Sequence, residues 1–106
     1  MTHISNGDKI SGQKVNDSVG TQGSCYVYSG TASDAAIYLD ADTYDGDELI
    51  IMNEGSYSVQ IKIKNSTAVL TYHMWAHGHE GLISEYPLPK GSVVHAIYTG
   101  DYWHLW

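Results

Sequence analysis

Short runs of β-forming residues, each closed off by a cluster of turn residues, follow one another through most of this chain. Gly, Asp, Asn and Pro recur between the runs at intervals of roughly ten residues, which is typical of sandwiches and barrels. The runs cover residues 25–29, 36–40, 48–53, 58–64, 68–75, 82–86, 92–99 and 102–106. We therefore predict an all-β fold in which short antiparallel strands form a small sandwich or barrel-like domain.

Two of these runs carry the clearest patterns. In residues 58–64, the apolar Val59, Ile61 and Ile63 alternate with polar residues, so this strand is expected to bury one face and expose the other. Residues 49–52 are continuously apolar, which predicts a strand covered on both faces. No segment keeps apolar residues at helical spacing over three turns, so any helix is expected to be short.

The chain divides into two parts by composition. Residues 1–24 are rich in Ser, Gly, Asn, Asp and Thr with only isolated apolar residues, and we interpret them as a polar leader or linker. Residues 25–106 form the predicted β domain. The final residues, GDYWHLW, are aromatic where chain ends usually fray, so we expect them to form a strand packed against other structure.

The charge balance excludes several kinds of partner. The formal net charge is −7, from twelve acidic residues against five lysines, because the chain contains no arginine. Nucleic acid is therefore an unsuitable partner, since its recognition depends on Lys and Arg. No apolar run reaches the ~20 residues of a spanning helix, and we expect no signal peptide and no membrane insertion. Cys25 is the single cysteine, so no disulfide can form within the chain.

Residues 46–106 contain two successions of turn residues and alternating apolar residues that occur together in one class of protein. The first reads GDELIIMNEGSYSVQIK and the second YPLPKGSVVHAIYTGDYWHLW. They resemble the distal β domains of bacteriophage tail fibres and related receptor-binding proteins, which often contain a "dGDxxxIxNxG" hairpin and end on "LxxGsxvxxxydGxxW". The matching positions are Gly46, Asp47, Glu48, Ile51, Asn53, Gly55, Leu88, Gly91, Ser92, Val94, Gly100 and Trp103.

The resemblance implies a parallel homotrimer at the tip of a virion tail fibre. Such a tip acts outside the cell and binds a host cell-surface glycan or an outer-membrane protein without altering it. The C-terminal β domain would then be the receptor-binding tip, and three weak sites on one axis would gain affinity through avidity.

Aromatic composition also favours recognition. The chain has nine Tyr and three Trp but no Phe. Tyr and Trp combine an apolar ring with a polar group, so they suit partly hydrated surfaces such as sugar-binding platforms. We select Trp75, Tyr102 and Trp106 as the ligand-binding residues. The alternative is that these rings fill a β core, where aromatic pairs are common.

The histidines of the segment around residue 77 suggest a metal site. His73, Trp75, His77 and His79 share parity, so an unbroken strand would project all four from one face. In some fibre tips, HxH pairs that resemble His77-Gly78-His79 enclose a six-coordinate iron with the same pairs of two other chains. Imidazole suits iron, nickel or zinc. The alternative is an exposed loop whose histidines bind nothing.

Other candidate sites are weaker. Residues 40–48 resemble a calcium loop, but the acids and Gly46 fall at the wrong positions for an EF-hand, so we interpret the segment as an acidic turn and place calcium behind the transition metals. Cys25 lacks the surroundings of a papain-type nucleophile. Glu80 and Glu85 form a conceivable glycosidase pair, although sequence spacing does not establish it.

Three functions therefore remain open. The favoured one is a trimeric receptor-recognition module without enzymatic activity. The second is a monomeric, lectin-like carbohydrate-binding module, and the third is a small glycan depolymerase that uses Asp and Glu. Oligomeric state separates the first from the second, and release of reducing ends identifies the third.

Overall fold

A computed structural model describes residues 1–12 and 24–106, and this part of the chain contains strands and turns but no helix. Accordingly, it holds no helix long and apolar enough to cross a membrane. The strands are β1 (Thr2–Ile4), β2 (Lys9–Ile10), β3 (Ser24–Tyr28), β4 (Ala36–Asp40), β5 (Glu48–Asn53), β6 (Val59–Lys64), β7 (Val69–Leu70), β8 (Met74–Ala76), β9 (Glu85–Leu88), β10 (Val93–Tyr98) and β11 (Trp103–Leu105). The all-β prediction is confirmed.

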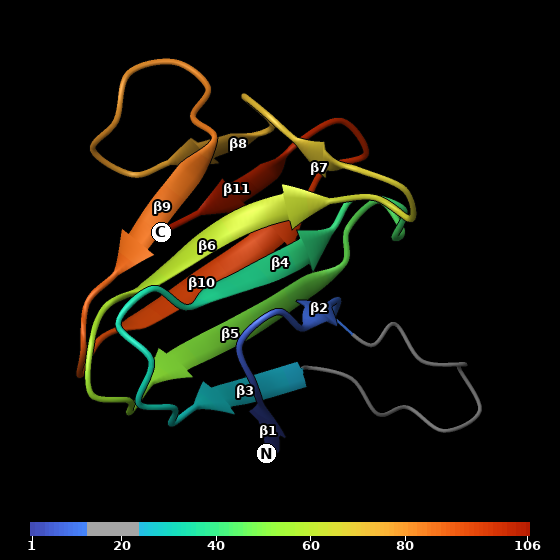
Figure 1. Cartoon of the computed structure of the whole chain (residues 1–106). Helices are drawn as coiled ribbons and strands as arrows, with labels where there is room; N and C mark the ends of the chain where they lie inside the picture. Colours follow the sequence, from blue (N-terminus) through green and yellow to red (C-terminus); the bar gives the residue numbers. More distant parts are fainter. Residues whose placement is uncertain (13–23) are drawn as a thin grey trace.

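The strands form two sheets that face each other across one core (Figure 1). Sheet A has the order β1-β3-β5-β10-β11-β8, and sheet B has the order β2-β4-β6-β7 with β9 also paired to β6. From β1 to β6 the chain alternates between the sheets, so each strand pairs with the one that lies two positions later in the sequence. The first half is thus a two-layered roll of three coils, and β10 and β11 extend sheet A beyond it.

Strand pairing differs from the antiparallel arrangement that we predicted. The neighbours within the roll are parallel in both sheets, and so are β11 and β8. Antiparallel pairs occur at β5–β10, β10–β11, β6–β7 and β6–β9. The segment expected to be a hairpin is not one, because β5 and β6 lie in different sheets. The turns within the roll carry the chain across to the other layer, and a parallel return requires such a crossover.

The first twelve residues belong to the body of the domain, which corrects the interpretation of that segment as a linker. Strand β1 pairs with β3, and β2 pairs with β4. The side chains of Ile4 and Ile10 are buried in the core. One apolar residue in each of β1 and β2 is enough, because the strands with which β1 and β2 pair belong to sheets that supply the rest of the core. Residues 13–23 of the predicted linker lie outside the described residues.

The core lies between the two sheets. Along a strand, side chains alternate between this core and the outer surface of the sheet. Strand β6 follows the prediction, with Val59, Ile61 and Ile63 fully buried. Strand β5 does not, because Leu49 and Ile51 are buried whereas Ile50 is 37% exposed. The prediction that β5 is covered on both faces is therefore wrong. Sheet B covers its inner face, and none of the strands described covers its outer face.

The C-terminal strand is packed as expected. Trp103 is completely buried, and its indole Nε1 donates a hydrogen bond of 3.0 Å to the backbone oxygen of Asp40. Leu105 is 2% exposed. The predicted strand at residues 68–75 is instead divided into β7 and β8, because Tyr72 adopts a left-handed conformation (φ 53°) between them.

Candidate functional site

The outer surface of sheet A carries a cluster of rings on its three last strands, β10, β11 and β8. Alternation turns the residues between the buried ones outward on each strand. We call this cluster the aromatic face, and it consists of His73, Trp75, His95, Tyr102, His104 and Trp106. The core residues Met74, Trp103 and Val94 point the other way from the same strands.

Cross-strand register places an imidazole beside a larger ring throughout the aromatic face. Trp75 pairs with His104 across the parallel strands β8 and β11. The His73 and Tyr102 rings meet edge to face, with centroids 5.6 Å apart. The His95 and Trp106 rings lie 4.3 Å apart with a tilt of 43°. The aromatic face therefore alternates large rings with groups that can donate and accept hydrogen bonds.

Exposure separates these rings from the aromatic residues of the core. Trp75 is 39% exposed and Trp106 is 53% exposed. In the described part of the chain, no residue forms a hydrogen bond with their indole N–H groups or with the Tyr102 hydroxyl. By contrast, the buried Tyr98 hydroxyl donates to the backbone oxygens of Ala41 and Gly100, each at 3.1 Å. The polar groups of the outer rings thus remain available to a ligand.

All three residues predicted to bind a ligand lie on the aromatic face, although Tyr102 is only half-exposed. Two further residues of the face, His95 and His104, were not predicted from the sequence; His104 pairs with Trp75, and His95 pairs with Trp106 from the neighbouring strand β10. The alternation of buried and outward residues in residues 93–98 was the available signal, because it places His95 on the face opposite Val94 and Ala96. Without the strand order, however, nothing in the sequence placed it beside Trp106.

The two histidines predicted to bind metal do not both continue the strand that carries Trp75. His77 still pairs with β11, since its backbone N–H donates a 2.9 Å hydrogen bond to the Leu105 oxygen. Strand β8 ends at Ala76, and Gly78 turns the chain with φ 85°. His79 consequently leaves the line of the strand and contacts the Tyr86 ring at 5.9 Å. Within the described residues, no three His, Cys, Asp or Glu side chains are grouped to hold a metal ion. Iron binding by His77 and His79 of several chains stays a prediction, which metal analysis of untagged protein tests.

The acidic segment around residues 40–48 is a turn whose carboxylates are bound by neighbouring groups of the protein. Asp40 lies 3.7 Å from the Lys9 ammonium, and an Asp42 carboxylate oxygen accepts the backbone N–H of Ser66. The Thr43 hydroxyl donates to the buried Asp47 carboxylate. These contacts agree with the interpretation as a structural turn.

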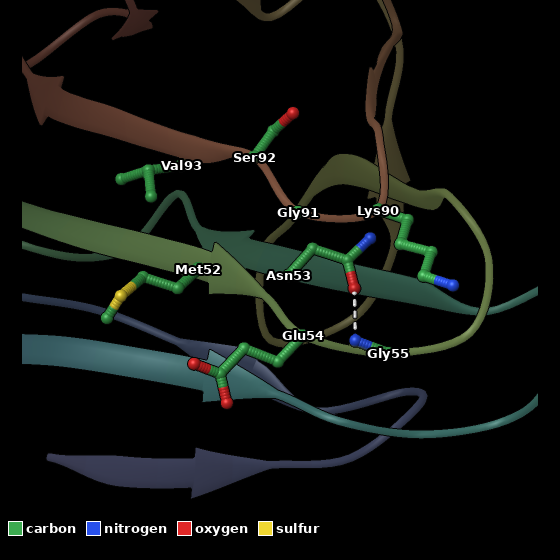
Figure 2. A pocket seen from close by; sticks show the side chains of 8 residues that line it. All are labelled: Met52, Asn53, Glu54, Gly55, Lys90, Gly91, Ser92 and Val93. Carbon is green, nitrogen blue, oxygen red and sulfur yellow. Dashed lines mark hydrogen bonds between the residues drawn. The ribbon is translucent and has the colours of Figure 1, made fainter.

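A shallow hollow of about 280 Å³ adjoins the outer surface of sheet A where β5 ends and β10 begins (Figure 2). Met52 and Val93 provide its apolar side, and the backbone of Asn53 is fixed by hydrogen bonds to Gly91 and Ser92. Figure 2 shows Glu54 and Lys90 extending in different directions, and neither takes part in an ion pair with another described residue. The hollow has no aromatic ring, so it lies outside the aromatic face and is not part of the candidate site.

Comparison with known protein families, with curated proteins and with solved structures finds no match for this chain. The function is therefore argued from the aromatic face itself. That face offers stacking surfaces and hydrogen-bonding groups on a rigid sheet, which is an arrangement suited to recognition.

Proposed function

We propose that this domain is a receptor-recognition module that binds a cell-surface glycan through the aromatic face. The observation that carries the proposal is that Trp75, Tyr102 and Trp106 gather on one face of one sheet. Tyr and Trp rings combine an apolar surface, which stacks on the C–H face of a sugar, with a polar group that remains hydrated. A shallow platform of this kind binds its ligand and releases it unaltered.

We further propose that three copies act together at the tip of a phage or phage-like tail fibre. This part rests on the resemblance of residues 46–106 to such domains. A single shallow site binds weakly, and three sites on one axis raise the overall affinity by effective concentration alone. The partners are then the chain itself and a receptor on the host cell surface.

A monomeric lectin-like module is the second candidate, and one observation favours it. The two sheets of a single chain enclose a core that includes the fully buried Trp103 and Ile37. A domain with its own core does not require other copies to fold. Measurement of molar mass in solution distinguishes a stable trimer from a monomer, and either result is compatible with glycan binding.

A glycan array tests binding. We expect the purified chain to retain a defined set of glycans, and the W75A and W106A variants to lose most of that binding. Tyr57 provides a matched control because its ring is 52% exposed but lies outside the aromatic face. Retention of full binding by both tryptophan variants, or equal loss in Y57A, would show that the site lies elsewhere.

A further inference from the structure

The aromatic face differs from the rest of the molecule in its charge. Of the lysines that the structure describes, Lys9, Lys62 and Lys64 lie in sheet B, and Lys90 lies in the turn before β10. The acidic side chain nearest in register is Glu48, whose carboxylate lies 3.4 Å from the His95 imidazole. The chain as a whole carries a formal charge of −7. An anionic ligand would therefore meet repulsion from the net charge, and none of the four described lysines lies on the aromatic face to compensate.

The spacing of the two tryptophans sets a minimum length for the ligand. Trp75 lies opposite His104, and Trp106 lies two residues further along the neighbouring strand. With the usual strand separation and rise per residue, the two Cβ atoms are about 8 Å apart. Indoles attached this far apart suit two adjacent sugar residues better than a single pyranose ring, and we therefore assign one sugar to each indole.

The imidazole between the two indoles has a free ring nitrogen. His104 uses Nε2 in a 3.3 Å contact with the Thr99 hydroxyl, and its Nδ1 forms no hydrogen bond within the described part of the chain. A neutral imidazole donates at one nitrogen and accepts at the other. It can therefore bond to a sugar hydroxyl, which also donates and accepts, without requiring a charge on the ligand.

We propose that the aromatic face binds an uncharged oligosaccharide of at least two residues. Trp75 and Trp106 stack on neighbouring sugar rings, and His104 bonds to a hydroxyl between them. This inference rests on the proposed glycan-binding function and adds the charge and the length of the ligand. It also predicts discrimination against uronic acids, in which a carboxylate replaces the primary alcohol.

The test compares ligands that differ in one property. Neutral oligosaccharides from the array are titrated against the whole chain beside their C6-oxidised uronate forms and their constituent monosaccharides, at about 20 mM and about 500 mM salt. We expect the neutral oligosaccharide to bind at least about tenfold more tightly than either comparison ligand, with less than about a twofold change between the two salt concentrations. W75A and W106A should each weaken binding by about tenfold, and K90A should leave it unchanged.

The possible failures are distinguishable. If the uronate binds more tightly, or K90A weakens binding and salt abolishes it, the ligand is acidic and this inference is wrong while the recognition function stands. If a monosaccharide binds as well as the oligosaccharide, the assignment of the two indoles to two sugars is wrong. If no saccharide of either charge binds, the inference and the proposed function both fail.

Discussion

Asn53 offers the sharpest test of the fold, because its side chain bonds to three backbone groups and so ties the turn that follows β5 to the distant strand β9. It is 1% exposed, and its Nδ2 donates to the backbone oxygens of Tyr57 and Leu88, both at 2.9 Å. Its Oδ1 accepts the N–H of Gly55 at 2.8 Å. The N53A variant leaves three backbone groups without these partners. At about 1 kcal/mol for each net hydrogen bond, the free energy of unfolding should fall by about 3 kcal/mol.

Urea unfolding measures this change. With an m value of about 1.5 kcal/mol/M, the midpoint should move down by about 2 M. Asn65 provides a matched control, because its side chain also makes three hydrogen bonds but lies in an exposed turn. Its Oδ1 accepts the backbone N–H and the hydroxyl of Thr67 and the backbone N–H of Ala68. Water replaces such bonds, so N65A should cost about 1 kcal/mol or less.

A third variant separates hydrogen bonding from packing. N53D keeps the volume of the side chain but turns a carboxylate oxygen toward two carbonyl oxygens, so we expect it to destabilise the protein at least as much as N53A at neutral pH. The reasoning is refuted if N53A costs no more than N65A, or if N53D unfolds at the wild-type midpoint.

Two further predictions concern the strands of sheet A. Burial, followed by the Asp101 carboxylate among other nearby acids, raises the pKa of Tyr98 above its ordinary value. The folded state thus holds this proton more tightly than the unfolded state, and the corresponding stability is present below pH 10 and is lost as the pH rises through the folded pKa. The stability advantage of wild type over Y98F should therefore narrow in urea titrations above pH 10, and a difference that stays constant contradicts the raised pKa of Tyr98. On β5, I51A should cost about 3 kcal/mol and I50A about 1 kcal/mol by urea unfolding, because Ile51 is fully buried and Ile50 is on the outer surface. Equal costs would mean that both faces of β5 are covered.

Local patterns in the sequence located most strands. The boundaries of β4 and β5 were predicted without error, and those of β6 and β10 to within a residue or so. Turn residues and β-branched residues act on their own neighbourhood, so their signal is readable along a single chain. Partner choice is different, because it depends on contacts between distant residues. The parallel pairing of β3 with β5 was therefore missed.

The same limit applies to burial and to the candidate site. The apolar run of residues 49–52 looks alike whether one or both faces are covered, since only the strands packed around β5 decide this. Trp75, Tyr102 and Trp106 were selected from their residue types. The sequence also indicated that Tyr102 and Trp106, four residues apart on one strand, lie on the same side of it. The neighbouring positions of His95 and His104 followed only from the order β10-β11-β8.

The alternation of the first six strands between the two layers has a consequence for cleavage and assembly. Each sheet takes a strand from every coil, so no cut in the connections from β2 to β6 yields a fragment that contains one complete layer. Both pieces of a nicked chain would stay interleaved, with backbone hydrogen bonds across the break and a shared core. We therefore expect a protease to nick exposed turns without separating the pieces under native conditions, and the two layers to melt in one cooperative step.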